Sequence, residues 1–148
     1  MEKLHYKKAL SWDPEYRHFR DEISRELGVL CGHDSLNGTD MLSLCVILGV
    51  MSGKRKEVKT YKSDLGVSKI ESNLHVKDLD TDTWNMLLGL AFVETGTLDD
   101  WDTTRKVIQE YAAAGLEQLV NVFNDPEKDL VDWVVTRLQE MDSRRAAQ

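Results

Sequence analysis

The sequence has little of several residue types, and each shortage excludes a class of protein. Its 148 residues include only two cysteines and two prolines. Two cysteines are too few for a secreted disulfide scaffold, so we expect reduced thiols and a cytoplasmic location. No apolar run approaches the roughly 20 residues that a membrane span needs, and the segment before Trp12 has no apolar signal core. We therefore expect no membrane contact.

The motifs that carry catalysis or bind a cofactor are also missing. There is no glycine-rich phosphate loop and no nucleophile elbow. Asp78, Asp80 and Asp82 alternate like the start of a calcium loop, but Thr83 and Gly89 stand where that loop needs glycine and glutamate. Helix capping explains these carboxylates better. We therefore predict a protein that is not an enzyme and has no cofactor or metal.

One short segment places catalytic residue types together. Cys31-Gly32-His33-Asp34 brings a thiol, an imidazole and a carboxylate side by side. Catalytic triads are assembled in space rather than from chain neighbours, and a metal would need two further ligands. A small hydrolase or metal protein at Cys31 and His33 is therefore the third-ranked interpretation.

Charge is abundant but unevenly distributed. The net charge is -7, with 41% hydrophobic and 30% charged residues, which is ordinary for a globular domain. Residues 1–77 hold 13 Lys and Arg against 11 Asp and Glu, whereas residues 78–148 hold 6 against 15. Any phosphate contact is expected in the first half. The acidic second half suits solvent or a basic partner.

The hydrophobic periodicity predicts one mainly α domain over residues 1–148. We expect a compact bundle of about five helices around a central apolar helix, with a small extended or irregular insertion between the second and third helices. The ends, 1–12 and 143–148, are expected to fray. The helices are expected to begin at Asp13-Pro14, at a Thr39 cap, at a Thr81 or Asp82 cap, near Thr103 and at Asp125-Pro126.

Three helices have features that predict how they pack. Met41 to Met51 is apolar on all sides, which is typical of a central helix, and Gly53 suits a left-handed end. Gly49 would let a neighbour approach closely, and the small segment 112–115 suits a tight helix crossing. In the third helix we expect an apolar face made of Trp84, Leu87, Leu88, Ala91 and Phe92.

The candidate site is a basic segment that follows the apolar helix. It places five cations within residues 54–62: Lys54, Arg55, Lys56, Lys59 and Lys62. Cations at a helix C-terminus complement the helix dipole, which accounts for the first two. The other three lie beyond the dipole and favour contact with phosphate or with an acidic partner. Trp101, in an acidic turn, is expected to be partly exposed and is a candidate partner contact.

Several short motifs resemble one protein family. They lie within residues 39–123 and comprise Thr39-Asp40, Leu48-Gly49, Gly53-Lys54-Arg55, Leu90-Ala91, Glu94-Thr95-Gly96, Tyr111 to Leu116, and Leu119. In the order of these motifs the chain resembles a family of small proteins encoded beside Dnd-type DNA phosphorothioation systems. The resemblance implies a defence-associated role in modification-linked restriction of foreign DNA. It supplies no catalytic residues.

These observations predict a non-enzymatic accessory protein. It would bind a larger protein component of a DNA modification or restriction system through the segment from Gly53 to Lys62, together with Trp101. The alternative is a small nucleic-acid-binding regulator that makes a weak contact through the same lysines. The sequence does not define an oligomeric state.

Overall fold

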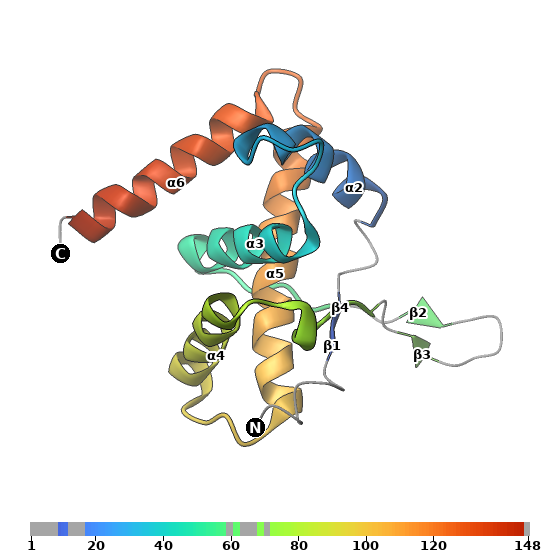
Figure 1. Cartoon of the computed structure of the whole chain (residues 1–148), viewed down its shortest axis with the longest axis vertical. Helices are drawn as coiled ribbons and strands as arrows, with labels where there is room; N and C mark the ends of the chain where they lie inside the picture. Colours follow the sequence, from blue (N-terminus) through green and yellow to red (C-terminus); the bar gives the residue numbers. More distant parts are fainter. Residues whose placement is uncertain (1–8, 12–16, 59–60, 63–67, 70–71, 147–148) are drawn as a thin grey trace.

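The computed structural model describes residues 9–11, 17–58, 61–62, 68–69 and 72–146, and within them the fold is mainly α, as predicted (Figure 1). The α-helices are α2 (Arg17–Glu26), α3 (Gly38–Ser52), α4 (Thr81–Thr95), α5 (Trp101–Phe123) and α6 (Leu130–Ala146). Two 3₁₀ helices, η2 (Leu27–Leu30) and η3 (Val76–Asp78), follow α2 and precede α4. The strands are β1 (Ala9–Ser11), β2 (Tyr61–Lys62), β3 (Ser68–Lys69) and β4 (Ser72–His75).

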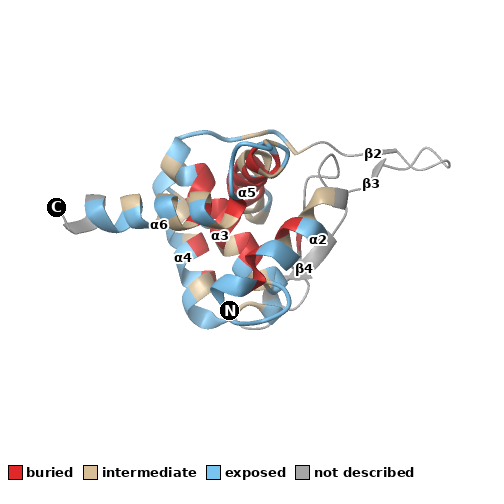
Figure 2. Ribbon diagram, turned by 90° about the horizontal axis from the view of Figure 1, so that it is seen from above, coloured by how far each residue is buried: buried red, intermediate tan, exposed pale blue. Residues whose placement is uncertain are grey.

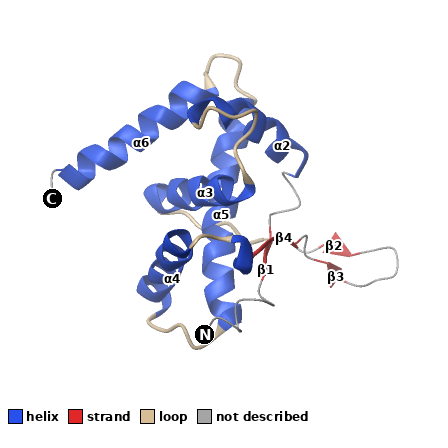
Figure 3. Cartoon of the chain, in the orientation of Figure 1, coloured by secondary structure: helices blue, strands red, loops and turns tan. Residues whose placement is uncertain are grey.

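The strands form two small antiparallel pairs (Figure 3). β2 pairs with β3 inside the predicted extended insertion, and β4 pairs with β1. The expectation of an irregular N-terminus through residue 12 is therefore wrong for β1, whose Leu10 is a fully buried core residue. At the other end α6 continues to Ala146, past the residue at which we expected fraying to begin.

The helix at the centre is α5. It packs against α2, α3, α4, α6 and β1, and it runs through the middle of the molecule in Figure 1. At 23 residues it spans about 35 Å, long enough for the other helices to pack at different heights. The prediction that Met41 to Met51 forms the centre is not confirmed, because α3 packs mainly on α5.

α3 and α5 cross backbone against backbone at two glycines. A Cβ atom built on Gly115 would overlap the carbonyl group of Cys45, with the carbonyl carbon 2.6 Å away. A Cβ atom on Gly49 would lie 2.9 Å from the carbonyl carbon of Tyr111. Buried residues gather around this crossing (Figure 2). The two close approaches that we predicted, at Gly49 and in segment 112–115, therefore occur at the same place, where α3 crosses α5.

Four helices, α3 to α6, begin at Asn and Asp caps that the sequence interpretation placed differently, whereas the predicted start at Asp13-Pro14 lies outside the described residues. Side chains of Asn37, Asp80 and Asp129 accept hydrogen bonds from the backbone N–H three residues on, at 2.8, 2.6 and 2.9 Å. Asp100 accepts from the N–H of Asp102. Thr39, Thr81 or Asp82, Thr103 and Asp125-Pro126 are therefore corrected as starting points. Asn and Asp are strong N-caps, and each observed cap lies within four residues of the start that we predicted.

One face of α4 was also predicted incorrectly. Trp84, Leu87 and Ala91 are buried as expected, and Leu88 is half-buried. Phe92, which we placed on the same face, is 52% exposed. Successive residues of an α-helix are about 100° apart around its axis, so Phe92 points away from the core that Ala91 faces. α4 is therefore apolar on its buried side and on part of its exposed side.

The glycine crossing predicts opposite effects of one substitution at two sites. Gly115→Ala should lower the free energy of unfolding by about 3 kcal/mol or more, because its methyl group has no space between the two backbones. Gly89→Ala, in the middle of α4 with nothing within 4 Å of an added Cβ, should raise it by about 0.5–1 kcal/mol. Urea denaturation of both variants tests this. Equal effects would show that helix propensity, not the crossing, decides.

Two capping carboxylates predict a dependence of stability on pH. Hydrogen bonds from Thr83 lower the pKa of Asp80 from 3.8, and one from the Thr103 hydroxyl does the same for Asp100. Because the unfolded chain binds the protons first as pH falls, this stabilisation is present above about pH 4 and is lost below it. Asn caps do not titrate. The difference in free energy of unfolding between wild type and an Asp80→Asn/Asp100→Asn variant should therefore shrink as the pH falls from about pH 5 to about pH 2 in urea titrations. A stability difference between the two proteins that stays constant with pH would contradict this prediction.

Candidate functional site

The basic segment leaves α3 along a fixed path. Gly53 ends the helix with φ 67° and ψ 21°, the left-handed conformation predicted for it. The N–H of Lys54 donates to the carbonyl of Gly49 at 3.2 Å, which closes the last turn. The Lys54 side chain is exposed. This exposed position is compatible with both interpretations of Lys54, as a cation that complements the helix dipole and as a contact for a partner.

Arg55 is held between two carboxylates. Its Nε donates to Oε1 of Glu110 at 3.1 Å, and a terminal nitrogen lies 3.0 Å from the same oxygen. The other terminal nitrogen lies 3.7 Å from Oε2 of Glu94, and the guanidinium carbon lies 5.7 Å from the centre of the Tyr111 ring. We call Arg55, Glu94, Glu110 and Tyr111 the Arg55 cluster. It joins the segment after α3 to both α4 and α5.

Tyr111 completes the cluster as a hydrogen-bond donor. Its hydroxyl donates to Oε1 of Glu94 at 2.8 Å. Burial raises the pKa of Tyr111, and the bond to Glu94 and its charge raise it further, against an opposing effect of Arg55. The phenol therefore keeps its proton at neutral pH and can donate throughout the physiological range.

The remaining predicted site residues are dispersed. The N–H of Lys56 donates to the carbonyl of Glu110 at 3.0 Å, and its side chain is half-buried. Lys62 lies in β2, and Lys59 lies outside the described residues. Trp101 is the first residue of α5, half-buried with its ring centre 6.0 Å from that of Trp84.

Trp101 belongs to a different part of the surface from Arg55. It starts a helix rather than lying in a turn, although its partial exposure is as expected. It precedes Glu110 by nine residues on α5, or roughly 14 Å along the axis. The structure therefore does not join Trp101 to the basic segment through the Arg55 cluster.

Sequence reasoning missed Glu94, Glu110 and Tyr111 as partners of the basic segment. A signal was present for two of them. Glu94 and Tyr111 belong to the short motifs that carry the family resemblance, and so does Arg55. In the structure those motifs meet in one cluster, although they are 39 and 17 residues apart in the chain.

The chemistry of this region is that of a mixed-charge surface. Beside the Arg55 cluster lies a cleft of about 290 Å³. It is lined by Glu57, Val58, Asp102, Arg105, Lys106, Gln109 and Glu110. Lys106 lies 4.0 Å from the second oxygen of Glu110, so that this carboxylate faces two cations. Acidic and basic groups alternate here and compensate one another.

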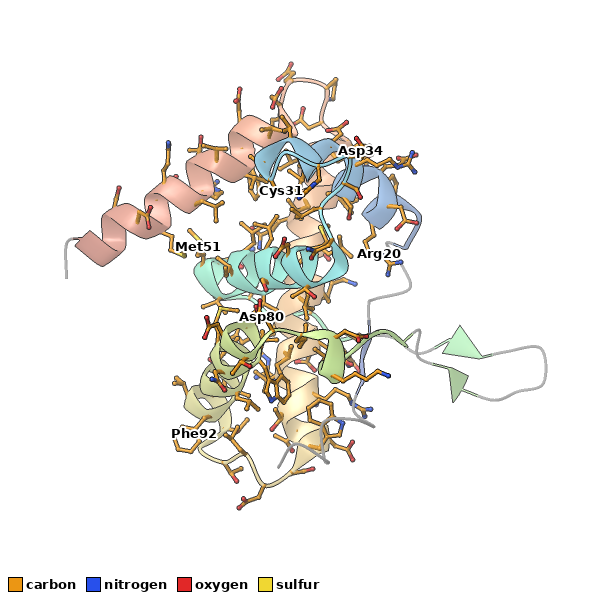
Figure 4. The ribbon with its side chains drawn as sticks, viewed as in Figure 1. Arg20, Cys31, Asp34, Met51, Asp80 and Phe92 are labelled. Carbon is orange, nitrogen blue, oxygen red and sulfur yellow. The ribbon has the colours of Figure 1, made fainter. Side chains whose placement is uncertain are left out.

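The Cys31 segment is explained by the local turn. Cys31 and Asp34 lie in the loop between η2 and α3 (Figure 4). The thiol of Cys31 donates to the carbonyl of Gly28 at 3.3 Å, and a Cβ on Gly28 would lie 2.7 Å from the nitrogen of Ser35. The loop therefore folds tightly over Gly28. No group of three or more His, Cys, Asp or Glu among the described residues could hold a metal ion.

Comparisons with protein-family models, with curated proteins and with solved structures found no significant match. Within the part of the chain that the structure describes, none of the helices combines the length and apolar character of a membrane span.

The Arg55 cluster predicts a measurable coupling between residues far apart in sequence. In a double-mutant cycle, Arg55→Met and Glu110→Gln should show a coupling energy of about 1–2 kcal/mol, because each group compensates the other in a half-buried site. The cycle is measured by urea denaturation. Lys54→Ala, at the exposed neighbour, should change the free energy of unfolding by less than about 0.5 kcal/mol. Additive effects of the two cluster variants would show that the ion pair contributes nothing to stability.

Proposed function

We propose that this chain is a non-enzymatic accessory protein of a DNA phosphorothioation-linked modification or restriction system that acts in antiviral defence. It would bind a larger protein component of that system in the cytoplasm, using the segment from Gly53 to Lys62. The link to DNA modification rests on the resemblance of the motifs between residues 39 and 123. The choice of a protein as the partner rests on the surface itself.

The observation that carries this choice is the mixture of charges around the basic segment. Arg55 contacts Glu94 and Glu110, and Glu57 follows Lys56 directly. A nucleic acid is bound by cations that replace its condensed counterions, which favours a surface of one sign. Alternating charges instead suit the complementary surface of a protein.

The first part of the segment, residues 53–56, is also held in place before any partner arrives. The backbone bond from Lys56 to Glu110 and the side-chain bonds of Arg55 attach it to α5. A contact surface that is already ordered loses less conformational entropy on binding. Lys54 and Glu57 are exposed on this fixed segment and are the described residues best placed to touch a partner.

The nucleic-acid-binding regulator is the second candidate, and one observation favours it. β2 and β3 pair so that Lys62 and Lys69 stand on neighbouring strands, with Lys62 opposite Ser68 and Tyr61 opposite Lys69. A two-stranded antiparallel ribbon is one of the elements that can enter the major groove of DNA.

Recovery of the tagged chain from its host at native expression tests the accessory role. A larger protein should co-purify in a fixed ratio, and Lys54→Glu/Lys56→Glu should lose it. Lys128→Glu/Arg25→Glu makes the same charge change at two exposed residues away from the Arg55 cluster and its cleft, and should retain the partner. A chain recovered alone would contradict the proposal.

Retention on immobilised DNA separates the second candidate. The accessory role predicts no retention at about 50 mM salt. Retention that falls steeply as salt rises, and that disappears when Lys54, Arg55, Lys56, Lys59 and Lys62 are all replaced by Glu, would favour the regulator instead.

A further inference from the structure

A polar cleft lies between α2 and the start of α3, and we call it the α2–α3 cleft. Its volume is about 440 Å³. Arg20 lies on the side of α2 that faces the beginning of α3 (Figure 4). The two sides of the cleft both contribute to its polar lining, which consists of Arg20, Asp21, Ser24, Arg25, Ser35 and Gly38.

The side of the cleft opposite α2 is held by backbone contacts. The N–H of Leu36 donates to the carbonyl of Ser24 in α2 at 2.8 Å. A Cβ atom on Gly28 would lie 2.7 Å from the backbone nitrogen of Ser35, so the loop before α3 packs directly on the end of α2. The two sides are therefore positioned before a ligand enters, which lowers the conformational entropy that binding costs.

Arginine and serine side chains give this cleft donors that suit an oxyanion. Arg20 and Arg25 each carry five N–H donors in a planar group that matches the oxygens of a phosphate. Ser24 and Ser35 add one hydroxyl group from each side. The Arg20 side chain is only 16% exposed, so its charge acts where water screens it less than at the open surface. Arg20 also interacts within the chain, and its five donors allow a further partner.

The start of α3 adds backbone donors to the same cleft. The Asn37 side chain accepts a hydrogen bond from the N–H of Asp40 at 2.8 Å. The N–H groups of Gly38 and Thr39, in the first turn, have no carbonyl partner within the helix. Because Gly38 lines the cleft, the positive end of the helix dipole adds to the charge of the two arginines.

The lining of the cleft differs in sign from the protein as a whole. Among the described residues that line it, Asp21 alone is acidic, so two arginines and one aspartate give +1, against -7 for the whole chain. Asp21 is 70% exposed, and its Oδ1 lies 3.7 Å from Nε of Arg20, too far for a hydrogen bond. Asp34 and Asp40 are close in sequence, but neither lines the cleft.

We propose that the α2–α3 cleft binds a phosphate group, either free or as an ester of a small molecule. The two arginines would hold its oxygens from α2, and Ser35 and Gly38 would donate from the other side. Half-buried Leu36 and buried Met41 also line the cleft and would contact the organic part of an ester. α3 separates the cleft from the Arg55 cluster by roughly 20 Å, so phosphate binding goes beyond the accessory role and does not depend on it.

NMR titration of the backbone amides at constant ionic strength tests the site, with inorganic phosphate and phenyl phosphate as probes. Each should bind with a dissociation constant on the order of 1 mM and shift the signals of residues 24–25 and 35–39 in a saturable way. Tighter binding of phenyl phosphate would identify an ester as the ligand, and equal affinities would identify free phosphate. Shifts that do not saturate and that spread over the exposed lysines would overturn the proposal.

A charge reversal at Arg25 tests the arginines without disturbing the core. Arg25→Glu changes an exposed residue and should weaken both probes at least about tenfold, because it replaces a charged donor by a repelling carboxylate. Lys128→Glu makes the same charge change in the loop before α6 and should alter affinity by less than about twofold. Both variants should retain the protein partner of the accessory role, so the two proposals can fail separately. Equal affinities in the two variants would contradict phosphate binding at this cleft.

Asp21→Asn gives a test that a damaged fold cannot imitate. The substitution removes the carboxylate that repels a phosphate in the cleft, so both probes should bind a few-fold more tightly. Glu127→Asn, at an exposed residue before α6, also removes one negative charge and should leave the affinity unchanged. Binding that is not tightened by Asp21→Asn would show that the charge of the cleft does not act on the ligand, and would overturn the proposal.

Discussion

The structure depends on the direct contact of two helix backbones. Where α3 crosses α5, Gly115 leaves room for the carbonyl of Cys45, and Gly49 leaves room for the carbonyl of Tyr111. Because no side chain separates the helices, their distance and angle are fixed by backbone atoms. The direction in which the chain leaves α3 is fixed as a consequence, and so is the point at which Arg55 reaches α5. Tyr111 takes part in both features, with its carbonyl at the crossing and its hydroxyl on Glu94.

The same residues bear on the short motifs from which we expected a family resemblance. Gly49, Arg55, Glu94 and Tyr111, together with Gly115, belong to those motifs, and each has a structural role at the crossing or in the Arg55 cluster. Motifs of this kind specify an architecture. Residues that select a partner would then lie at exposed positions outside these motifs, such as Glu57.

The sequence allowed prediction of features that depend on neighbours in the chain. The number of helices, the left-handed end at Gly53 and the suitability of Gly49 and segment 112–115 for close contact all follow from local residue types. Features set by distant residues were not predictable. The ion pair between Arg55 and Glu110 joins residues 55 apart. The exposure of Phe92 depends on which side of α4 meets α5. The central place of α5 reflects its length and packing, not its hydrophobicity.

The helix starts were predicted incorrectly for a different reason. Asn37, Asp80, Asp100 and Asp129 each stand within a few residues of another good capping residue or start signal, so composition alone gives two nearly equal choices. Packing decides between them, because a helix that is anchored on α5 must begin at a particular height. The resulting displacement of a few residues is enough to move Trp101 from a turn into a helix.

The two cysteines differ in their accessibility to solvent and reagents. Cys45 is fully buried on α3, its carbonyl is in contact with Gly115, and burial raises the pKa of its thiol, whereas Cys31 is exposed in a loop. A thiol-modifying reagent therefore reaches Cys31 in the native state but reaches Cys45 only when α3 separates from α5. In the unmodified protein, the ratio of the two labelling rates is thus a direct measure of how often the helix crossing opens.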